Sequence, residues 1–185
     1  MSESHFECIL WDFGGVFTGS PFYSIDIYSA HLGVKSQELI ELVLGYGLDD
    51  GDHHWHRLER GEITMVEALE EIEVLTSTRG IEGFEIRDFF KSMGGKSDTT
   101  EEMFDAVRRY KDLGINQFIL SNNILEFSSS WKSMLPENIF DGIIDSSEVG
   151  IRKPDPKIFT LALEIADNSA DKTIFLDDYF LCILV

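Results

Sequence analysis

Short apolar runs alternate with longer amphipathic stretches through much of the chain, and this alternation predicts its elements. The predicted strands are residues 6–11, 117–120, 142–144 and 173–176. The helices predicted between the later strands are residues 99–113, 125–135 and 156–166. Strands that alternate with helices favour parallel β-α-β units whose sheet is covered on both faces.

The pattern changes between residues 17 and 98, where apolar residues recur at helical spacing and glycines or acidic turns separate the segments. The helical segments predicted there are residues 21–32, 37–44, 55–60 and 65–75, and residues 80–95 form the return connection. We therefore expect an α/β fold with a Rossmann-like parallel sheet core, residues 1–16 plus 99–185. A helical cap, residues 17–98, is inserted after its first strand.

Four polar motifs follow or lie between these strands. They are Asp12 before Gly14-Gly15, Ser121-Asn122-Asn123, Lys153 before Pro154-Asp155-Pro156, and Asp177-Asp178. In an open parallel sheet, ligands bind in the crevice at the carboxyl ends of the strands. Each motif alone has an ordinary interpretation as a turn, a helix cap, a solvated lysine or an acidic loop. Together and in this order, they predict one site that handles phosphate.

As a set, the motifs resemble those of the haloacid dehalogenase-like hydrolase superfamily. Within it they are most similar to the phosphatase branch that includes the N-terminal domain of soluble epoxide hydrolase and acyl-CoA-dehydrogenase-fused domains. The resemblance covers nearly the whole chain. It rests on the segments 11–17, 150–156 and 175–178.

The resemblance implies a role for each motif. Asp12 is the expected nucleophile and forms an aspartyl-phosphate. Ser121 and Asn122 hold the phosphoryl group, and Lys153 neutralises it while pairing with Asp177. Mg²⁺ is the expected cofactor. It would be bound by Asp12, the backbone carbonyl of Gly14 and Asp178.

Gly14 departs from the family pattern, because phosphatases of this superfamily usually carry a general acid at that position. The loss of such a group typically lowers the rate by about 10²–10⁴-fold. Three alternatives follow: the leaving group needs no proton, another acid serves, or the protein binds phosphate without turnover. The polar cluster of residues 49–56 is the place to look for a substitute acid. A solvated turn leading into a helix is our first interpretation of it, and a substrate-facing histidine the second.

The apolar segment 179–185 is unusual for this family, whose members continue with a polar loop and a further helix. We expect a truncated C-terminus that supports the fourth motif poorly, and the alternative is an edge strand. Cys8 and Cys182 show no metal-site spacing, so we expect buried, reduced thiols.

The formal net charge of the 185-residue chain is −19, and the acidic excess is spread over the whole sequence. Such a surface repels nucleic acids and anionic membranes, so neither is an expected partner, whereas a small anionic substrate is. The N-terminus resembles no signal peptide and no apolar stretch reaches membrane-spanning length, which favours the cytoplasm. Oligomeric state is left open.

The function we expect is a Mg²⁺-dependent phosphatase of a small organic phosphate. One rival is a dehalogenase, in which Asp12 attacks carbon without a metal. The other is a phosphate-binding or regulatory module of weak activity.

Overall fold

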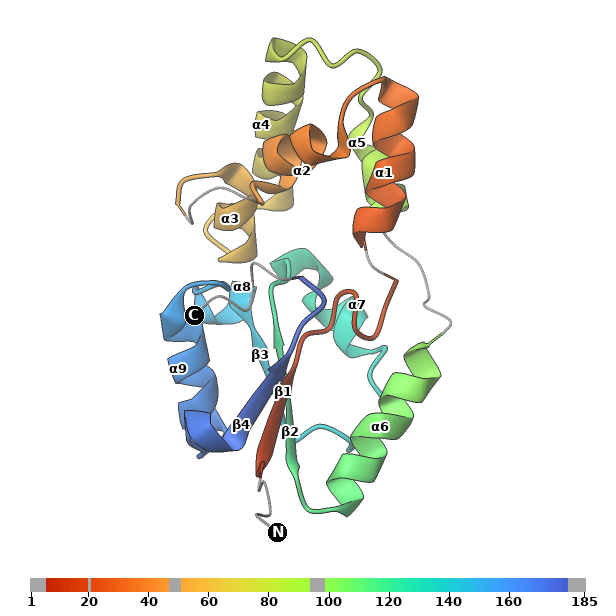
Figure 1. The fold of residues 1–185 in the computed structure, drawn as a ribbon. Coiled ribbons are helices and arrows are strands. Elements are labelled where there is room, and N and C mark those ends of the chain that lie inside the picture. Colours follow the sequence, from red (N-terminus) through yellow and green to blue (C-terminus); the bar gives the residue numbers. More distant parts are fainter. Residues whose placement is uncertain (1–5, 20, 47–50, 94–98, 180–185) are drawn as a thin grey trace.

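The computed structural model describes residues 6–19, 21–46, 51–93 and 99–179 (Figure 1). A parallel sheet of four strands forms its base, in the order β3-β2-β1-β4. The strands are β1 (Cys8–Trp11), β2 (Asn116–Ser121), β3 (Gly142–Asp145) and β4 (Thr173–Leu176). The α/β class and the Rossmann-like parallel sheet are thus confirmed.

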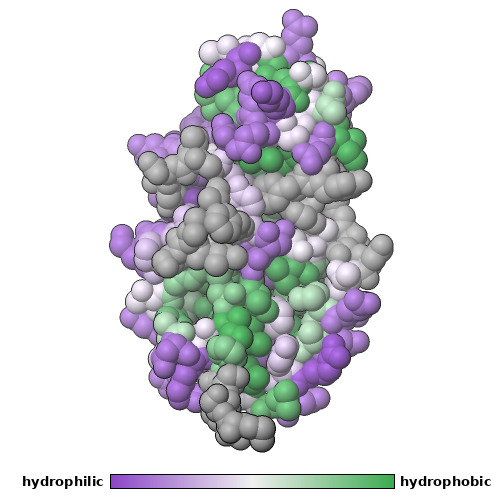
Figure 2. All heavy atoms as spheres, in the orientation of Figure 1, coloured by the Kyte–Doolittle hydropathy of each residue, from purple (hydrophilic) through white to green (hydrophobic). Residues whose placement is uncertain are grey.

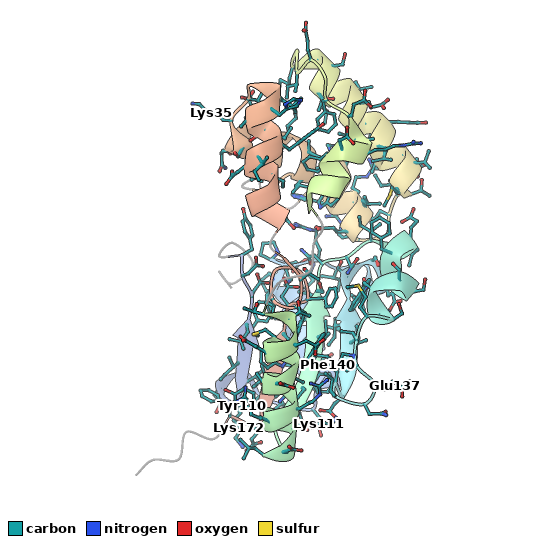
Figure 3. All side chains as sticks on the ribbon, turned by 90° about the vertical axis from the view of Figure 1, so that its right-hand side faces the viewer. Lys35, Tyr110, Lys111, Glu137, Phe140 and Lys172 are labelled. Carbon is teal, nitrogen blue, oxygen red and sulfur yellow. The ribbon has the colours of Figure 1, made fainter. Side chains whose placement is uncertain are left out.

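Side chains of the central strands alternate between the two faces of the sheet, as the pleat of a strand requires. On one face, Ile9, Trp11 and Ile119 pack with residues of α6 (Thr100–Asp112) and α7 (Ser128–Lys132). On the other, Cys8, Leu10 and Leu120 pack with α9 (Pro156–Ile165). Cys8 is a buried free thiol, as predicted. Figure 3 shows α6 in front of the sheet, with Tyr110 and Lys111 near its lower end.

The short helix α8 (Ser146–Val149) directly follows β3. The helices that lie between residues 21 and 93 gather above the carboxyl ends of the strands (Figure 1). They are α1 (Pro21–Leu32), α2 (Ser36–Leu44), α3 (His54–Glu59), α4 (Met65–Thr78) and α5 (Ile86–Met93). Their apolar residues form a separate core, which includes Leu39, Leu58 and Ile72. Ile124, which follows β2, also packs in this core, whereas Phe17 packs with the sheet.

The first turns of two helices show the capping interactions that their residue types favour. Asp155 Oδ1 accepts a hydrogen bond from Lys157 N–H at 2.9 Å, with Pro156 in the first turn of α9. Thr64 caps α4 in a full capping box with Glu67. The sequence Thr99-Thr100-Glu101-Glu102 has the pattern of a capping box and predicts a side-chain cap at Thr99. This prediction is wrong: Thr99 makes no capping hydrogen bond, because its φ of −95° and ψ of 0° are already helical.

Two further expectations differ from the structure. The segment predicted as one helix over residues 125–135 is a 3₁₀ turn, Leu125–Phe127, followed by the short α7. The return connection contains a helix, α5, because Phe89 is fully buried in the core of the upper helices.

The described sheet carries an apolar surface on its β4 side, which faces the viewer in Figures 1 and 2. In Figure 2, hydrophobic residues gather over the lower half, and hydrophilic residues border them on both sides. β4 stands at one edge of the described sheet, and its last residue, Leu176, is exposed. The C-terminal segment and Cys182, on which two expectations rest, lie outside the described residues. No helix within the described ranges is long and apolar enough to cross a membrane.

Candidate active site

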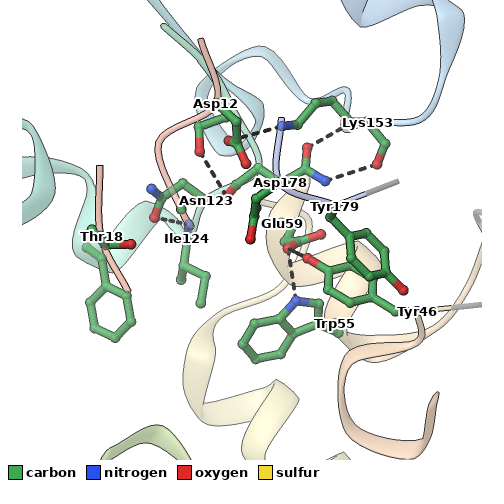
Figure 4. A pocket seen from close by; sticks show the side chains of 14 residues that line it. Asp12, Thr18, Tyr46, Trp55, Glu59, Asn123, Ile124, Lys153, Asp178 and Tyr179 are labelled. Carbon is green, nitrogen blue, oxygen red and sulfur yellow. Dashed lines mark hydrogen bonds and ion pairs between the residues drawn. The ribbon is translucent and has the colours of Figure 1, made fainter. Parts of the chain in front are cut away.

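The four predicted motifs meet at the carboxyl edge of the sheet, because all strands run in the same direction. Trp11 of β1 lies opposite both Ile119 of β2 and Leu176 of β4, so the residues that follow them emerge side by side. They surround a cavity of about 270 Å³ between the carboxyl edge of the sheet and α3, and Figure 4 shows the side chains that line it. Of the predicted site residues, those that line it are Asp12, Gly14, Ser121, Asn122, Lys153 and Asp178.

Lys153 connects the first and fourth motifs. Its Nζ lies 3.0 Å from Asp12 Oδ1 and 2.6 Å from Asp177 Oδ2. The Lys153 side chain is only 1% exposed, and its ammonium also lies over the Phe175 ring. A buried ammonium is stable only when it is paired, and here two carboxylates pair with it.

Asp12 is held by the backbone as well as by the lysine. Its own N–H donates to the Leu176 carbonyl at 2.8 Å, and its Oδ1 accepts from Phe13 N–H at 2.7 Å. Burial raises the pKa of Asp12 to about 6, against the smaller opposing effect of Lys153. The Lys153 ammonium and the Phe13 N–H both contact Oδ1, and Oδ2 takes part in neither of these contacts.

Asn122 acts on the backbone of the lysine. Its Oδ1 accepts from Lys153 N–H at 2.8 Å, and its Nδ2 donates to the Lys153 carbonyl at 3.0 Å. The two bonds fix the start of the lysine side chain. Ser121, the last residue of β2, is buried against the cavity wall, and its hydroxyl donates to the Asn122 carbonyl at 3.4 Å. The predicted phosphate contact of the Asn122 side chain thus competes with its bonds to Lys153.

The acidic residues fit a hard divalent cation. Asp12, Asp177 and Asp178 each offer a carboxylate oxygen, and these oxygens lie within 4.8 Å of one another. Asp177 is engaged by Lys153 and by Tyr179 N–H, whereas Asp178 is exposed. Oxygen ligands from one or two carboxylates, with the remaining positions taken by water and substrate, suit Mg²⁺. We conclude that the residues present match the cofactor expected from the sequence.

The position beside this cluster, residue 15, requires a glycine. Its φ is +76°, and a Cβ built on it would lie 2.0 Å from Asp178 Oδ2. Glycine alone therefore lets the turn after Asp12 pass so close to Asp178. At the neighbouring Gly14, a Cβ would meet no atom within 4 Å.

The upper wall of the cavity comes from the helices above the sheet, and sequence reasoning missed its residues. Tyr46, Trp55 and Glu59 line it. Glu59 is only 3% exposed and pairs with Arg152, whose Nε lies 2.7 Å from Glu59 Oε2. No local pattern distinguishes Glu59 from the many other acids of residues 17–98, because its partner is 93 positions away.

The histidines of segment 49–56 do not supply an acid to the cavity. His54 and His56 are buried, and their Nε2 atoms lie 3.1 Å from the carbonyls of Val43 and Gly45. The expected solvated turn leading into a helix is present, since Gly51 and Asp52 are exposed and α3 begins at His54, but the two imidazoles in that helix are buried against the end of α2. Trp55 is the residue from this stretch that lines the cavity. Asp49 and Asp50 lie outside the described residues.

Comparison with known proteins agrees with this geometry. The sequence model of the haloacid dehalogenase-like hydrolases matches residues 6–180. Mouse acyl-CoA dehydrogenase family member 10 is 30% identical over 94% of this chain, which corresponds to only 16% of that protein. Sesquiterpene phosphatase astK of Aspergillus oryzae is 27% identical, with 94% of this chain and 81% of that protein covered. Pig bifunctional epoxide hydrolase 2 is 29% identical over 66% of this chain and 24% of its own length.

Solved structures share the fold. An enzyme of the family from Bacteroides thetaiotaomicron, solved with magnesium and inorganic phosphate, superposes with a TM-score of 0.60 at 19% identity. That match covers 95% of this chain and 86% of the other. A dehalogenase superposes with a TM-score of 0.63 at 13% identity, over 98% of this chain and 80% of the other. At these identities the likeness concerns the fold alone.

Proposed function

This chain belongs to the haloacid dehalogenase-like hydrolase family, and we propose that it is a Mg²⁺-dependent phosphatase acting on a small organic phosphate through Asp12. One observation carries the proposal. The Lys153 ammonium bridges Asp12 and Asp177 at the floor of a cavity that Ser121 and Asp178 also border. A carboxylate nucleophile and a positive charge beside it are what phosphoryl transfer through a covalent intermediate requires.

In the proposed reaction, Asp12 Oδ2 attacks phosphorus, and the bond between phosphorus and the leaving-group oxygen breaks. The product is an aspartyl-phosphate, which water hydrolyses to inorganic phosphate and free Asp12. Lys153 and the Ser121 hydroxyl hold the phosphoryl oxygens. Asn122 positions Lys153 with its side chain and adds its backbone N–H to the phosphate site.

Mg²⁺ would be held by Asp12, Asp178 and the Gly14 carbonyl, and when bound it supplies charge stabilisation at the transferring group. The cluster of carboxylate oxygens supports this assignment. Attack on carbon in a dehalogenase needs no such cluster. The similarity to a sesquiterpene phosphatase along most of both chains also favours phosphate over halide chemistry.

The leaving group of the proposed substrate departs without a proton, as in an acyl or aryl phosphate. Gly14 has no acid to offer. The described acids that line the cavity are Asp12, Asp178 and Glu59, of which the first two serve as nucleophile and metal ligand. Glu59 accepts from Trp55 Nε1 at 2.9 Å and from Arg152 Nε at 2.7 Å, so both of its carboxylate oxygens are engaged as acceptors.

We propose a division into a core, residues 1–16 plus 99–185, and a cap, residues 17–98. The two separate apolar cores support it, and Phe17, which packs with the sheet side, lies at its boundary. The acidic composition disfavours nucleic acid and anionic membrane partners. We also propose a cytoplasmic enzyme of small molecules.

The test is hydrolysis of 4-nitrophenyl phosphate by the protein and by Asp12→Asn, with Mg²⁺ or with a chelator. We expect the chelator to abolish turnover. Asp12→Asn should lower kcat by about 10³-fold or more, because the amide cannot act as the nucleophile. Asp171→Asn, an exposed aspartate outside the cavity, is the matched control. Equal turnover by Asp12→Asn and the unmodified protein would assign the activity to another site and refute the proposal.

A further inference from the structure

A buried ion pair borders the cavity on the side of the helices above the sheet. Glu59 Oε2 lies 2.7 Å from Arg152 Nε, and the two side chains are 4% and 3% exposed. Glu59 Oε1 also accepts from Trp55 Nε1 at 2.9 Å and from the Tyr46 hydroxyl at 3.4 Å. In every one of these contacts Glu59 is the acceptor, as suits a carboxylate, and its direct ionic partner is the Arg152 guanidinium.

The two members of the pair differ in their access to the cavity. Glu59 lines it, as Figure 4 shows, whereas Arg152 is not among the lining residues. The pair therefore presents its negative end to a ligand, with the guanidinium behind it. An anionic group of a ligand at this wall would meet a carboxylate at short range.

Beside Glu59, the described residues of the cavity wall offer no positive charge that could compensate a ligand anion. Around Glu59 the wall is formed by the aromatic residues Tyr46 and Trp55. Among the described lining residues, Lys153 is the one with a positively charged side chain, and its ammonium already pairs with Asp12 and Asp177. A second anionic group on the substrate would therefore be buried without a cation, which is costly.

We propose that Glu59 is a specificity-determining residue that restricts the enzyme to phosphates with an uncharged organic portion. Phosphates that carry a carboxylate or a second phosphate on that portion are rejected by the Glu59 charge and by the lack of a partner for theirs. The inference rests on the proposed function, since it assumes that the phosphoryl group occupies the Lys153 side of the cavity.

Replacement of Glu59 by glutamine should reverse the preference at this wall. Glutamine keeps the size and can still accept from Trp55, but it leaves the Arg152 charge without its carboxylate. The potential at the wall then becomes positive, which favours an anionic ligand group.

The test compares the dissociation constants of benzylphosphonate and 4-carboxybenzylphosphonate, measured by calorimetry in the presence of Mg²⁺. These compounds are not hydrolysed and differ by one carboxylate. We expect the unmodified protein to bind benzylphosphonate at least about tenfold more tightly than its carboxylated analogue, and Glu59→Gln to reduce this ratio by about tenfold. Glu62→Gln is the matched control, because Glu62 pairs with Arg60 at 2.6 Å on the exposed surface and does not line the cavity.

The outcomes distinguish a failure of the Glu59 proposal from a failure of the proposed phosphatase function. Equal affinities in the unmodified protein, or an unchanged ratio in Glu59→Gln, overturn the role of Glu59 and leave the phosphatase proposal intact. Failure of both compounds to bind, together with absence of phosphate hydrolysis, overturns the proposed function and the inference with it. If Glu59→Gln shows no cooperative unfolding, Glu59→Leu/Arg152→Met replaces it. This double variant removes both charges, leaves neither buried alone and must also lose the discrimination.

Discussion

At the scale of single residues, two adjacent glycines serve different purposes. Gly15 has a left-handed φ, and any side chain there would collide with Asp178. Gly14 lines the cavity, its φ is outside the left-handed region, and a Cβ there would point into open space. Gly14 is therefore a position where the backbone tolerates a side chain and where an acid would face the ligand.

Gly14→Asp should add the general acid that the position lacks. We expect kcat for an alkyl phosphate, whose leaving group needs a proton, to rise by about 10²–10⁴-fold, and kcat for an aryl phosphate to change little. Steady-state kinetics with both substrate types measures the difference. Gly14→Asn is the control, because it has the same shape and cannot donate a carboxyl proton. Equal gains for both substrates, or the same gain in the asparagine variant, would refute an acid role.

At the scale of elements, buried histidine side chains of α3 contact backbone carbonyls at the end of α2. Burial lowers the pKa of His53 to about 4 and that of His56 to about 3, in the latter case with a contribution from Arg152. His53 also caps α3, since its Nδ1 accepts from Trp55 N–H at 3.2 Å. These rings are therefore neutral in the folded protein near pH 7.

The lowered pKa values of His53 and His56 predict how the free energy of unfolding depends on pH. Once unfolded, each ring recovers a pKa near 6.5, so between that pH and about 4 the unfolded chain binds more protons than the folded one. The free energy of unfolding should fall as the pH is lowered through this range, by at most about 1.4 kcal/mol per pH unit for each histidine.

Urea unfolding at pH 7.0, 6.25 and 5.5 tests this expectation, since few carboxylates titrate there. His56→Gln should show a shallower loss of stability than the unmodified protein, because glutamine can donate to the Gly45 carbonyl without a change of charge. His31→Gln, on an exposed position of α1, controls for the loss of a histidine as such. Identical slopes in all three proteins would contradict the linkage.

At the scale of the whole molecule, hydrogen bonds join the upper helices to the sheet side, and residues from both line the cavity. Ser146 Oγ donates to the Glu59 carbonyl at 2.6 Å, and Met65 N–H donates to Glu126 Oε1 at 2.7 Å. These bonds join segments that are far apart in sequence. A ligand in the cavity would thus be bound only by the folded chain.

Mg²⁺ with beryllofluoride, a mimic of the phosphoryl group on an aspartate, should therefore stabilise the protein. At 100 times its dissociation constant, such a ligand adds about 2.7 kcal/mol, which corresponds to roughly 5–10 °C in Tm for a chain of this size. The shift should require both components and disappear in Asp12→Asn. Differential scanning calorimetry measures it, and a shift of equal size in Asp12→Asn would place the ligand elsewhere.

Much of the fold could be predicted from local patterns. The strand Thr173–Leu176 and the helix start at Asp155-Pro156 lie where the sequence indicates, because alternation of apolar residues and capping chemistry act over a few positions. The edge where Asp12 and Asp177 meet Lys153 also follows from the parallel order of the strands. At Thr99 the same kind of local argument failed, since the residue is already helical there.

The sequence by itself thus determined the α/β class, the motifs and the hydrolase family, because these depend on residue types and short spacings. Only the tertiary structure decided which side chains complete the cavity. Glu59 meets Arg152 across 93 residues, and His56 is buried against Gly45 rather than exposed in a turn. Such partners are brought together by the packing of the upper helices on the carboxyl edge of the sheet. That packing cannot be read from residue spacings along the chain.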